Sequence, residues 1–531
     1  MSQIEKWGVF ETAVNGKSEG NPFLDHEITG TFTGEHETVK VNGFYDGEGV
    51  YRVRLMPSYE GRYTYTIEGS AVDAPVMGEF EAISAMGNNH GPVRVVDETL
   101  LAYADGTPHY SVGTTCYAWV NQSMELQEQT LDTLSQSPFN KIRFCVFPKF
   151  YEFNRQEPVT YPFERGHGEG LDPALVEIQD NRTYWPLEPV PEMDYGFDYT
   201  RPNVKHFQRF DLRIKQLMEL GIEADIILMH PYDRWGMNEM DAAACDAYLK
   251  YMVARYGAFR NVWWSLANEY DTIPTKTAED WERYGLLIAE NDPYHHLCSV
   301  HNCITYYDFS KPWVTHQSLQ RTDFYKTTEY TDAFIEKYHK PAVWDEICYE
   351  GDISLGWGNI TAQELVRRFW EAFLRGGHAG HGETYLDEND GPVSERQAEP
   401  ALRGSAAPEE GRRQPVLWWS HGGILKGDSA SRIAFLKKIL EETPGRGLRK
   451  TEGIFDEVVG CAVDAPQDYQ IHYLGICQPK YRMLVLPEDG DFEVEIIDTW
   501  NMTITSAGNH RGATRIELPG NQYMAIRVRR V

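Results

Sequence analysis

The stretch NVWWSLANEYD, residues 261–271, predicts the fold of the largest part of this chain. Its apolar run, Val262 to Ala267, is typical of a strand that is buried on both faces of a parallel sheet. The run places Asn268 and Glu269 at its carboxyl end. In (β/α)8 barrels the catalytic groups stand at the carboxyl ends of the strands, so Glu269 is a candidate catalytic residue.

A second carboxylate is placed in the same way by PAVWDEICYEG, residues 341–351, where Glu346 follows an apolar run. The separation from Glu269 leaves room for about three further strand and helix units of a ~250-residue barrel. Asp345 and Glu346 are consecutive, so we expect them to point to opposite faces of the strand, with only one in the site. Two carboxyl groups on neighbouring strand ends are what glycoside hydrolysis requires.

The surrounding sequence alternates between strand and helix patterns, which indicates an α/β fold. From about residue 95 to 445 we count eight strand patterns, and we therefore predict a (β/α)8 TIM barrel. The eight expected strands lie in residues 109–120, 140–149, 222–236, 262–267, 296–302, 313–320, 341–351 and 378–385. Long connections follow the second and the eighth of these segments. Such loops are usually functional.

Short alternating segments with Gly-rich turns flank the barrel on both sides, and this pattern is typical of β-sandwiches. We therefore expect three domains: an immunoglobulin-like β-sandwich at residues 1–84, the catalytic barrel at 95–445 and a second β-sandwich at 450–531. The length of 531 residues agrees with two or three domains of about 100 to 250 residues each.

Charge and composition restrict the class of partner. The formal net charge of −30 argues against nucleic acid or an anionic membrane, since both favour Lys and Arg, and a neutral substrate is easier to accept. The amino terminus lacks the pattern of a secretory signal and no apolar run is long enough to cross a membrane, so we expect a cytoplasmic protein. The eight cysteines are scattered, which favours reduced thiols. We predict no cofactor, and a homo-oligomer remains open.

With the strands assigned, the chain resembles the superfamily of retaining (β/α)8 glycosidases, whose acid/base and nucleophile sit at the ends of the fourth and seventh strands. Arg143, His230, Asn268 with Glu269, and Glu346 match its pattern. More closely, YADGTPHYSVGTTCYAW (103–119) and NGFYDGEGVYRVRLMPSYEGRYTY (42–65) resemble the apiosidase-like barrel family and the β-sandwich that often precedes it. The resemblance implies an O-glycosyl hydrolase that cleaves a plant or microbial oligosaccharide with retention.

The resemblance also implies roles for the two carboxyl groups. We expect Glu346 to stay ionised beside Arg143 and to act as nucleophile. Glu269, close to another carboxylate and to apolar Trp263 or Trp264, should have a raised pKa and act as acid and then base. Asn268 should hydrogen-bond the sugar 2-hydroxyl.

The chain departs from the superfamily at the sixth strand. Many members have a Tyr there that hydrogen-bonds the nucleophile, whereas this chain has His316 and Gln317. We expect Tyr306 or Tyr307 to take that place.

Five further residues are candidate substrate contacts. His230 and His301 should orient the carboxyl groups or contact hydroxyls, although a structural hydrogen bond is an equally good interpretation. His316 is assigned to the site by its strand position. Trp119 and Trp235 lie just past strand ends and are candidate sugar platforms, but buried tryptophans are more often core residues.

Three alternatives stay open. Glu350 and Glu383 are rivals for the role of nucleophile. A metal-dependent hydrolase would use the histidines near strand ends, but these lack HxH or HExxH spacing; they are His230, His301, His316, His378 and His381. A binding or scaffolding protein without activity would bind glycans through its sandwiches. The long loops favour a closed, exo-acting pocket for a short oligosaccharide.

Overall fold

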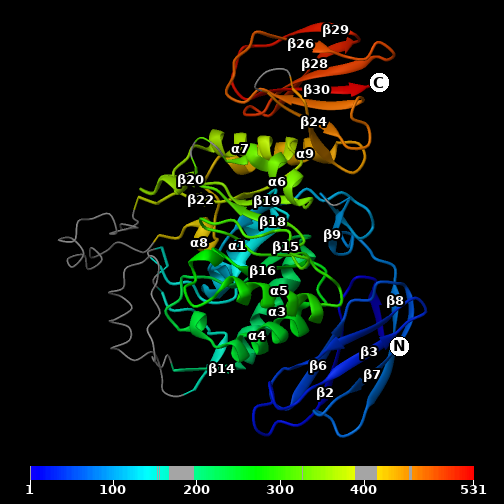
Figure 1. The fold of residues 1–531 in the computed structure, drawn as a ribbon, viewed down its shortest axis with the longest axis vertical. Coiled ribbons are helices and arrows are strands. Elements are labelled where there is room, and N and C mark those ends of the chain that lie inside the picture. The colour runs from blue at the N-terminus through cyan, green and yellow to red at the C-terminus, as the bar shows by residue number, and fades with distance from the viewer. Residues whose placement is uncertain are drawn as a thin grey trace, which may run out of the picture.

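The computed structural model has a barrel in the middle and a β-rich region at each end of the chain (Figure 1). It describes residues 2–97, 99–151, 153–154, 156–166, 196–323, 325, 327–388, 415–453 and 457–531. The predicted architecture is confirmed. The domain boundaries at residues 84, 95, 445 and 450 stay a prediction.

The amino-terminal region is a β-sandwich of a five-stranded and a three-stranded sheet, in the orders β1-β8-β7-β3-β4 and β2-β6-β5. Phe32 and Phe80 from the larger sheet and Val53 from the smaller one are fully buried in a shared core. The strands are β1 (Ser2–Glu5), β2 (Phe10–Asn15), β3 (Thr29–Thr33), β4 (Thr38–Asn42), β5 (Phe44–Tyr45), β6 (Val50–Leu55), β7 (Gly61–Glu68) and β8 (Val76–Ile83).

The central sheet contains eight parallel strands in the order β17-β16-β15-β12-β11-β21-β19-β18. A bridge between His301 and Ser318 joins its two ends and closes the barrel. The eight strands predicted from the sequence are therefore all present, in the predicted sequence order. They are β11 (Val112–Thr115), β12 (Lys141–Cys145), β15 (Glu223–Met229), β16 (Val262–Ala267), β17 (Cys298–Ser299), β18 (Gln317–Gln320), β19 (Ala342–Glu346) and β21 (His378–His381).

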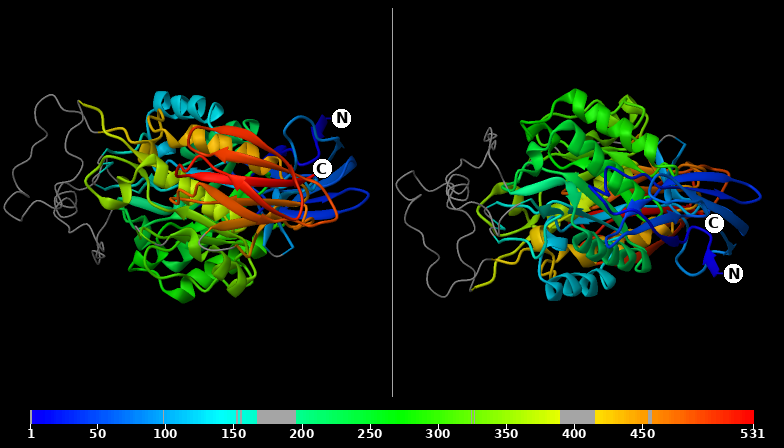
Figure 2. Two further views of the ribbon diagram at one scale, coloured as in Figure 1. Left: turned by 90° about the horizontal axis from the view of Figure 1, so that it is seen from above. Right: turned by 90° about the horizontal axis from the view of Figure 1, so that it is seen from below.

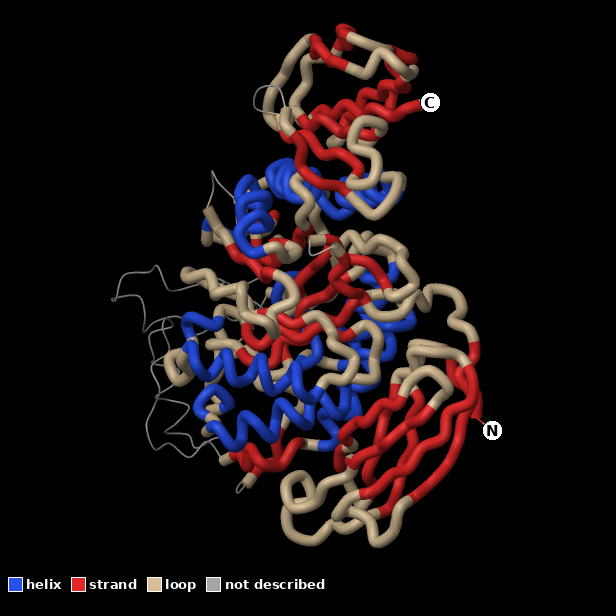
Figure 3. Tube along the Cα trace, turned by 45° about the vertical axis from the view of Figure 1, so that its right-hand side comes forward, coloured by secondary structure: helices blue, strands red, loops and turns tan. Residues whose placement is uncertain are grey.

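Helices cover the outside of the barrel (Figure 3). Side chains of Ser123, Asn203 and Asp241 accept hydrogen bonds from the first turns of α1, α3 and α4, as capping residues do. The connection between β17 and β18, residues 300–316, contains no helix, unlike the other connections that carry these helices. The helices are α1 (Met124–Ser135), α3 (Val204–Glu219), α4 (Ala242–Tyr256), α5 (Ala278–Asn291), α6 (Thr331–Tyr338), α7 (Ala362–Leu374), α8 (Trp418–His421) and α9 (Ser429–Glu441).

Short elements decorate the barrel. The antiparallel pairs are β9 (Val93–Val96) with β10 (Leu100–Tyr103) and β13 (Phe163–Arg165) with β14 (Phe197–Pro202). A parallel pair joins β20 (Glu350–Gly351) to β22 (Glu383–Thr384). Single 3-10 turns are η1 (Trp119–Asn121), η2 (Met237–Glu239), η3 (Tyr270–Thr272), η4 (Thr328–Tyr330) and η5 (Gly356–Gly358).

The carboxyl-terminal region has a six-stranded sheet in the order β23-β24-β25-β30-β27-β28 and a two-stranded sheet of β26 and β29. Fully buried Phe492, Val494 and Ile526 lie in the core of this region. The strands are β23 (Leu448–Thr451), β24 (Val458–Ala462), β25 (Tyr469–Tyr473), β26 (Tyr481–Val485), β27 (Phe492–Asp498), β28 (Thr503–His510), β29 (Ala513–Glu517) and β30 (Met524–Arg530).

Both terminal regions pack on the barrel, and both lie toward the same side of it when the molecule is viewed along its long axis (Figure 2). At the carboxyl-terminal contact, Trp370 of α7 stacks on Tyr473 of β25 with ring centroids 5.3 Å apart. At the amino-terminal contact, Arg54 donates to Asp211 of α3. Within the described residues, no helix has the length and apolar character needed to cross a membrane.

Candidate active site

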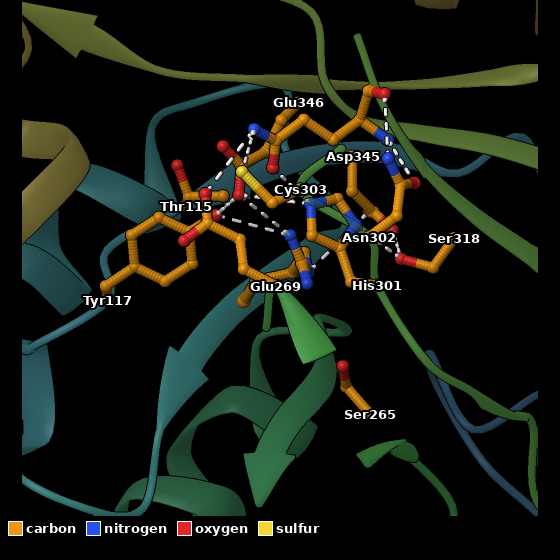
Figure 4. A network of polar contacts seen from close by, with 12 residues as sticks. Thr115, Tyr117, Ser265, Glu269, His301, Asn302, Cys303, Ser318, Asp345 and Glu346 are labelled. Carbon is orange, nitrogen blue, oxygen red and sulfur yellow. Dashed lines mark hydrogen bonds and ion pairs between the residues drawn. The ribbon is translucent and has the colours of Figure 1, made fainter. Parts of the chain in front are cut away.

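The two predicted carboxylates lie together at the carboxyl end of the barrel. Glu269 lies two residues after β16 and Glu346 is the last residue of β19 (Figure 4). Each of the two residues is only 7% exposed. Glu269 has a φ of 53°, a left-handed conformation that is uncommon for residues other than glycine. Strain of this kind concentrates at functional sites, which agrees with a role for Glu269 in chemistry.

Glu346 is held by three groups of opposite or neutral charge. The Tyr117 hydroxyl donates a hydrogen bond to its Oε1, and Nε2 of His301 lies 3.2 Å from the same oxygen. Nη1 of Arg143 is 3.8 Å away. Burial alone would raise the pKa of Glu346, but His301, Arg143 and Tyr117 outweigh it and lower the pKa to about 2. Glu346 is therefore ionised at neutral pH.

Glu269 has the opposite electrostatic environment. The Tyr232 hydroxyl donates to its Oε2 at 2.5 Å, and Nε2 of Gln320 is 3.4 Å from its Oε1. Burial raises the pKa of Glu269, and the negative charge of Glu346 raises it further. The two carboxyl groups therefore have pKa values that are pushed apart, as an acid and a nucleophile require.

Trp263 and Trp264, the predicted apolar neighbours of Glu269, have other partners in the structure. Trp263 donates its Nε1 hydrogen to Glu223, and Trp264 donates to Asp292, so both indoles are committed to carboxylates elsewhere in the barrel. The expected contact of Glu269 with Trp263 or Trp264 is wrong, because Glu269 lies beyond the end of the strand that carries them.

Asp345 also points into the barrel, contrary to our expectation that it and Glu346 face opposite sides. The register between β18 and β19 shifts after Leu319, so Leu319 pairs with Trp344 and Gln320 with Glu346. Asp345 is the extra residue of this bulge. Its carboxylate accepts hydrogen bonds from Lys141 and Ser318 inside the barrel. Asp345 therefore does not occupy the position of Glu346 in the site.

The tyrosine that binds Glu346 comes from an unexpected strand. Tyr117 lies just past β11, the first strand of the barrel, and takes the place that we expected for Tyr306 or Tyr307. Tyr306 instead packs on Phe334, and the Tyr307 hydroxyl bonds Glu282. That expectation is therefore wrong. Tyr117 falls within the first strand segment predicted from the sequence, residues 109–120, and its place toward the carboxyl end of that segment was the available signal.

Lys149 is a site residue that the sequence analysis missed. Its residue is 2% exposed, and its ammonium lies 4.1 Å from the ring centroids of both Tyr117 and Tyr232, the two tyrosines that hold the carboxylates. Burial lowers the pKa of Lys149, while its positive charge lowers the pKa of Glu269. Lys149 closes the segment NKIRFCVFPK, and its position after the second strand was the only signal in the sequence.

The three candidate histidines have different positions. His301 contacts Glu346 directly. His230 lies behind the site, where its Nδ1 accepts from the backbone of Tyr232 and burial lowers its pKa to about 3. His316 precedes β18 and packs edge-on against Trp263, so it is at the amino end of the barrel strands and its assignment to the site is wrong.

Trp119 and Trp235 are core residues. Both are fully buried; Trp119 donates to the carbonyl of Gln127, and Trp235 donates to Glu157. Neither ring is exposed to stack on a sugar, so both tryptophans are core residues and not sugar platforms. Trp419 lies closer to the site, edge-on to Tyr117 at 6.0 Å between ring centroids.

Arg143 and Asn268 are both at the predicted place. Arg143 rises from β12 between Glu346 and Asp225, with its Nε 3.4 Å from the Asp225 carboxylate. It therefore joins the site to the ionic network inside the barrel. Asn268 is buried beside Glu269, and its Oδ1 has no hydrogen-bond partner within the residues that the structure describes.

The rival carboxylates Glu350 and Glu383 accept hydrogen bonds from the backbone of residues 426–429, before and at the start of α9. Glu346, by contrast, has the contacts with Tyr117, His301 and Arg143. The geometry therefore favours Glu346 over both rivals.

Known family models match three parts of the chain. Residues 96–445 match the family described as the apiosidase-like catalytic domain. Residues 3–70 and 456–529 match two domains of unknown function, DUF5060 and DUF5605. No curated protein matches this chain.

Two solved structures are similar over most of the chain. A protein of Bacteroides vulgatus ATCC 8482, provisionally described as a glycoside hydrolase, is 33% identical, with all of both chains covered and a TM-score of 0.85. A glycoside hydrolase family 5 protein of the same organism is 15% identical, covers 84% of this chain and 95% of its own, and has a TM-score of 0.57, which shows a shared fold. This chain thus belongs to the apiosidase-like family and is glycoside-hydrolase-like in family and fold.

Proposed function

We propose that this protein is a retaining glycoside hydrolase in which Glu346 is the nucleophile and Glu269 is the acid and base. The observation that carries the proposal is the opposed electrostatics of the two carboxyl groups. Glu346 has a pKa lowered to about 2, and Glu269 has a raised pKa. A retaining glycosidase requires one ionised and one protonated carboxyl group on either side of the scissile bond.

In the first step, the Glu346 carboxylate attacks the anomeric carbon and Glu269 gives its proton to the leaving oxygen. The product is a glycosyl ester of Glu346, which no longer carries a negative charge. Because the charge of Glu346 contributes to the raised pKa of Glu269, the ester lowers that pKa. Glu269 is then ready to take a proton from water in the second step, which releases the sugar.

The surrounding residues support both steps. His301 and Arg143 stabilise the charge of Glu346 while it is the free carboxylate and again when the ester is cleaved. Tyr232 fixes Glu269 by a hydrogen bond. We assign Asn268, whose Oδ1 has no hydrogen-bond partner among the described residues, to the sugar 2-hydroxyl, where hydrogen bonds strengthen in the transition state.

The substrate in this proposal is a plant or microbial oligosaccharide, cleaved from one end. The exo assignment depends on the length of the connections after the second and eighth strands. Residues 167–195 and 389–414 of these connections lie outside the described residues. Release of single sugars, rather than internal cleavage of a long polymer, is the result that the exo assignment requires.

Glu346→Gln tests the nucleophile. The substitution keeps the shape of the side chain and removes the attacking charge, so we expect kcat to fall by several orders of magnitude on whichever nitrophenyl glycoside of a broad panel the wild type cleaves. Proton NMR of the first anomer released should show retention.

Glu336→Gln, the same change at an exposed position of α6, is the matched control and should keep wild-type activity. Equal activity of Glu346→Gln and wild type would reject the assignment, and an inverted first product would reject retention.

A further inference from the structure

A second cluster of buried ionisable residues, Glu350, His381 and Glu383, lies where β21 continues into β22. Strand geometry brings the three together. Glu350 pairs directly with Glu383 in the parallel ladder of β20 and β22. His381 is two residues before Glu383, so an extended chain places both side chains on one face. One ligand atom from each residue lies within 4.8 Å of the other two.

The cluster concentrates negative charge in the interior. None of the three residues is more than 2% exposed. Two acids directly opposite each other in a ladder repel, and buried charges are normally paired or bind a metal. Lys426, whose backbone N–H bonds Glu383, places its ammonium 2.8 Å from Asp387 instead. A cation between Glu350 and Glu383 would relieve the repulsion.

The imidazole of His381 is oriented toward these carboxylates. Its Nδ1 lies 3.2 Å from Oγ1 of Thr114, which leaves Nε2 to face the carboxylates. Nε2 is fully buried, has no hydrogen-bond partner within the described part of the chain, and lies 3.6 Å from Oε1 of Glu350. A metal-binding histidine has this arrangement, with one nitrogen fixed by a neighbour and the other toward the ion.

The carboxylates are also held in place from behind. Glu383 accepts hydrogen bonds from the backbone of Lys426 at 2.6 Å and Gly427 at 2.9 Å. Glu350 accepts from the backbone of Asp428 and Ser429, each at 3.2 Å. Hydrogen bonds of this kind orient the ligands of a metal site.

We propose that Glu350, His381 and Glu383 bind one divalent cation, with Zn²⁺ or Mn²⁺ as the class that fits. One imidazole nitrogen with carboxylate oxygens suits these ions, because imidazole favours Zn²⁺ and carboxylates favour Mn²⁺. The ion would hold β20, β21 and β22 together beside the segment that leads into α9, and so stabilise this part of the barrel. This inference does not depend on the proposed glycosidase activity.

The test is metal binding by the full chain after dialysis against a chelator. Equilibrium dialysis with Zn²⁺ and separately with Mn²⁺, read by elemental analysis, should give one equivalent for the wild type. Glu383→Gln, which keeps the side-chain shape, and His381→Gln should lower the affinity by at least about 10-fold. The bound ion should also raise the Tm of the wild type, because it binds the native state.

His316→Gln is the matched control, since it makes the same change in a buried barrel histidine outside the cluster, and it should bind like the wild type. If His381→Gln does not fold, Glu383→Gln and Glu350→Gln carry the comparison. The proposal is overturned if the wild type takes up neither ion, or if the folded cluster variants bind as tightly as the wild type.

Discussion

Single residues push the pKa values of the two carboxyl groups in the candidate active site apart. Tyr117 binds Glu346 and Tyr232 binds Glu269, and the ammonium of Lys149 lies against both tyrosine rings. Because Lys149, Glu269 and Glu346 are all buried, their charges act on one another with little screening. Lys149 therefore limits how far the pKa of Glu269 can rise.

Lys149→Met should move the basic limb of the pH profile of kcat/KM to higher pH. In the proposed mechanism Glu269 is the acid and must be protonated, so activity should fall as the pH rises through its pKa. Removal of the positive charge makes the ionised form less favourable, and the pKa of Glu269 rises further.

The profile should be measured on the glycoside that the wild type cleaves, with Lys437→Met as control. Lys437 is partly buried and donates to the carbonyl of Pro138 away from the site, so its variant should keep the wild-type profile. A basic limb that is unchanged or lower in Lys149→Met would refute the role of Lys149.

Secondary-structure elements explain two irregular features of the barrel. The bulge in β19 places both Asp345 and Glu346 inside the barrel, so one strand end supplies residues to the internal ionic network and to the site.

The connection from β17 to β18 has no helix, and Trp313 of this connection packs on α5 at Gly285. A glycine inside a helix is normally a cost, so its presence here indicates close packing.

Gly285→Ala should destabilise the protein although alanine is the better helix former. Helix propensity favours the change by about 1 kcal/mol. The added Cβ would overlap the indole of Trp313, and overpacking of a buried contact costs about 1–3 kcal/mol. We therefore expect a lower Tm in calorimetry.

Glu290→Ala, at an exposed position of the same helix, is the control and should change the Tm little. A Tm for Gly285→Ala above that of the wild type would show that Trp313 moves aside without cost.

At the scale of the whole molecule, buried ion pairs join the amino-terminal sandwich to the barrel. Asp211 of α3 accepts from Arg54 of β6 at 2.6 Å and from Arg255 of α4 at 2.8 Å. Arg255 also lies 2.9 Å from Asp46, which follows β5. These residues hold three elements together, so the interface depends on the charge of Asp211.

Asp211→Asn should lower the free energy of unfolding by about 3–5 kcal/mol, because it leaves two buried guanidinium groups short of a counter-charge. Burial raises the pKa of Asp211, but Arg54 and Arg255 outweigh it and lower the pKa below its usual value. The stabilisation is therefore present above the unfolded-state pKa and is lost as the pH falls through the folded-state pKa.

Denaturant unfolding at several pH values checks this prediction. Asp246→Asn removes a more exposed ion pair, with Arg283, and should have a much smaller effect. Equal losses in the two variants would contradict a special role of the buried pair, and so would a loss in Asp211→Asn that does not shrink at low pH.

The order of the eight strands and the places of Asn268, Glu269 and Glu346 followed from the sequence alone. Apolar runs such as Val262 to Ala267 mark strands that are buried on both faces, and the residue after such a run is at the carboxyl end of the barrel. This information is local, because it is contained in a short run of consecutive residues. Arg143 and His301 were found in the same way.

Only the tertiary structure decided which residues contact these carboxylates. Tyr117 and Glu346 are far apart in the sequence, and so are Lys149 and Glu269. The assignment of His316 to the site was wrong because β18 begins only at Gln317, so His316 lies at the amino end of its strand. The same holds for the cluster of Glu350 with His381 and Glu383, where no metal was expected from spacing. The reason is physical: these contacts depend on strand register, a bulge and closure of the barrel, which arise from packing between distant segments.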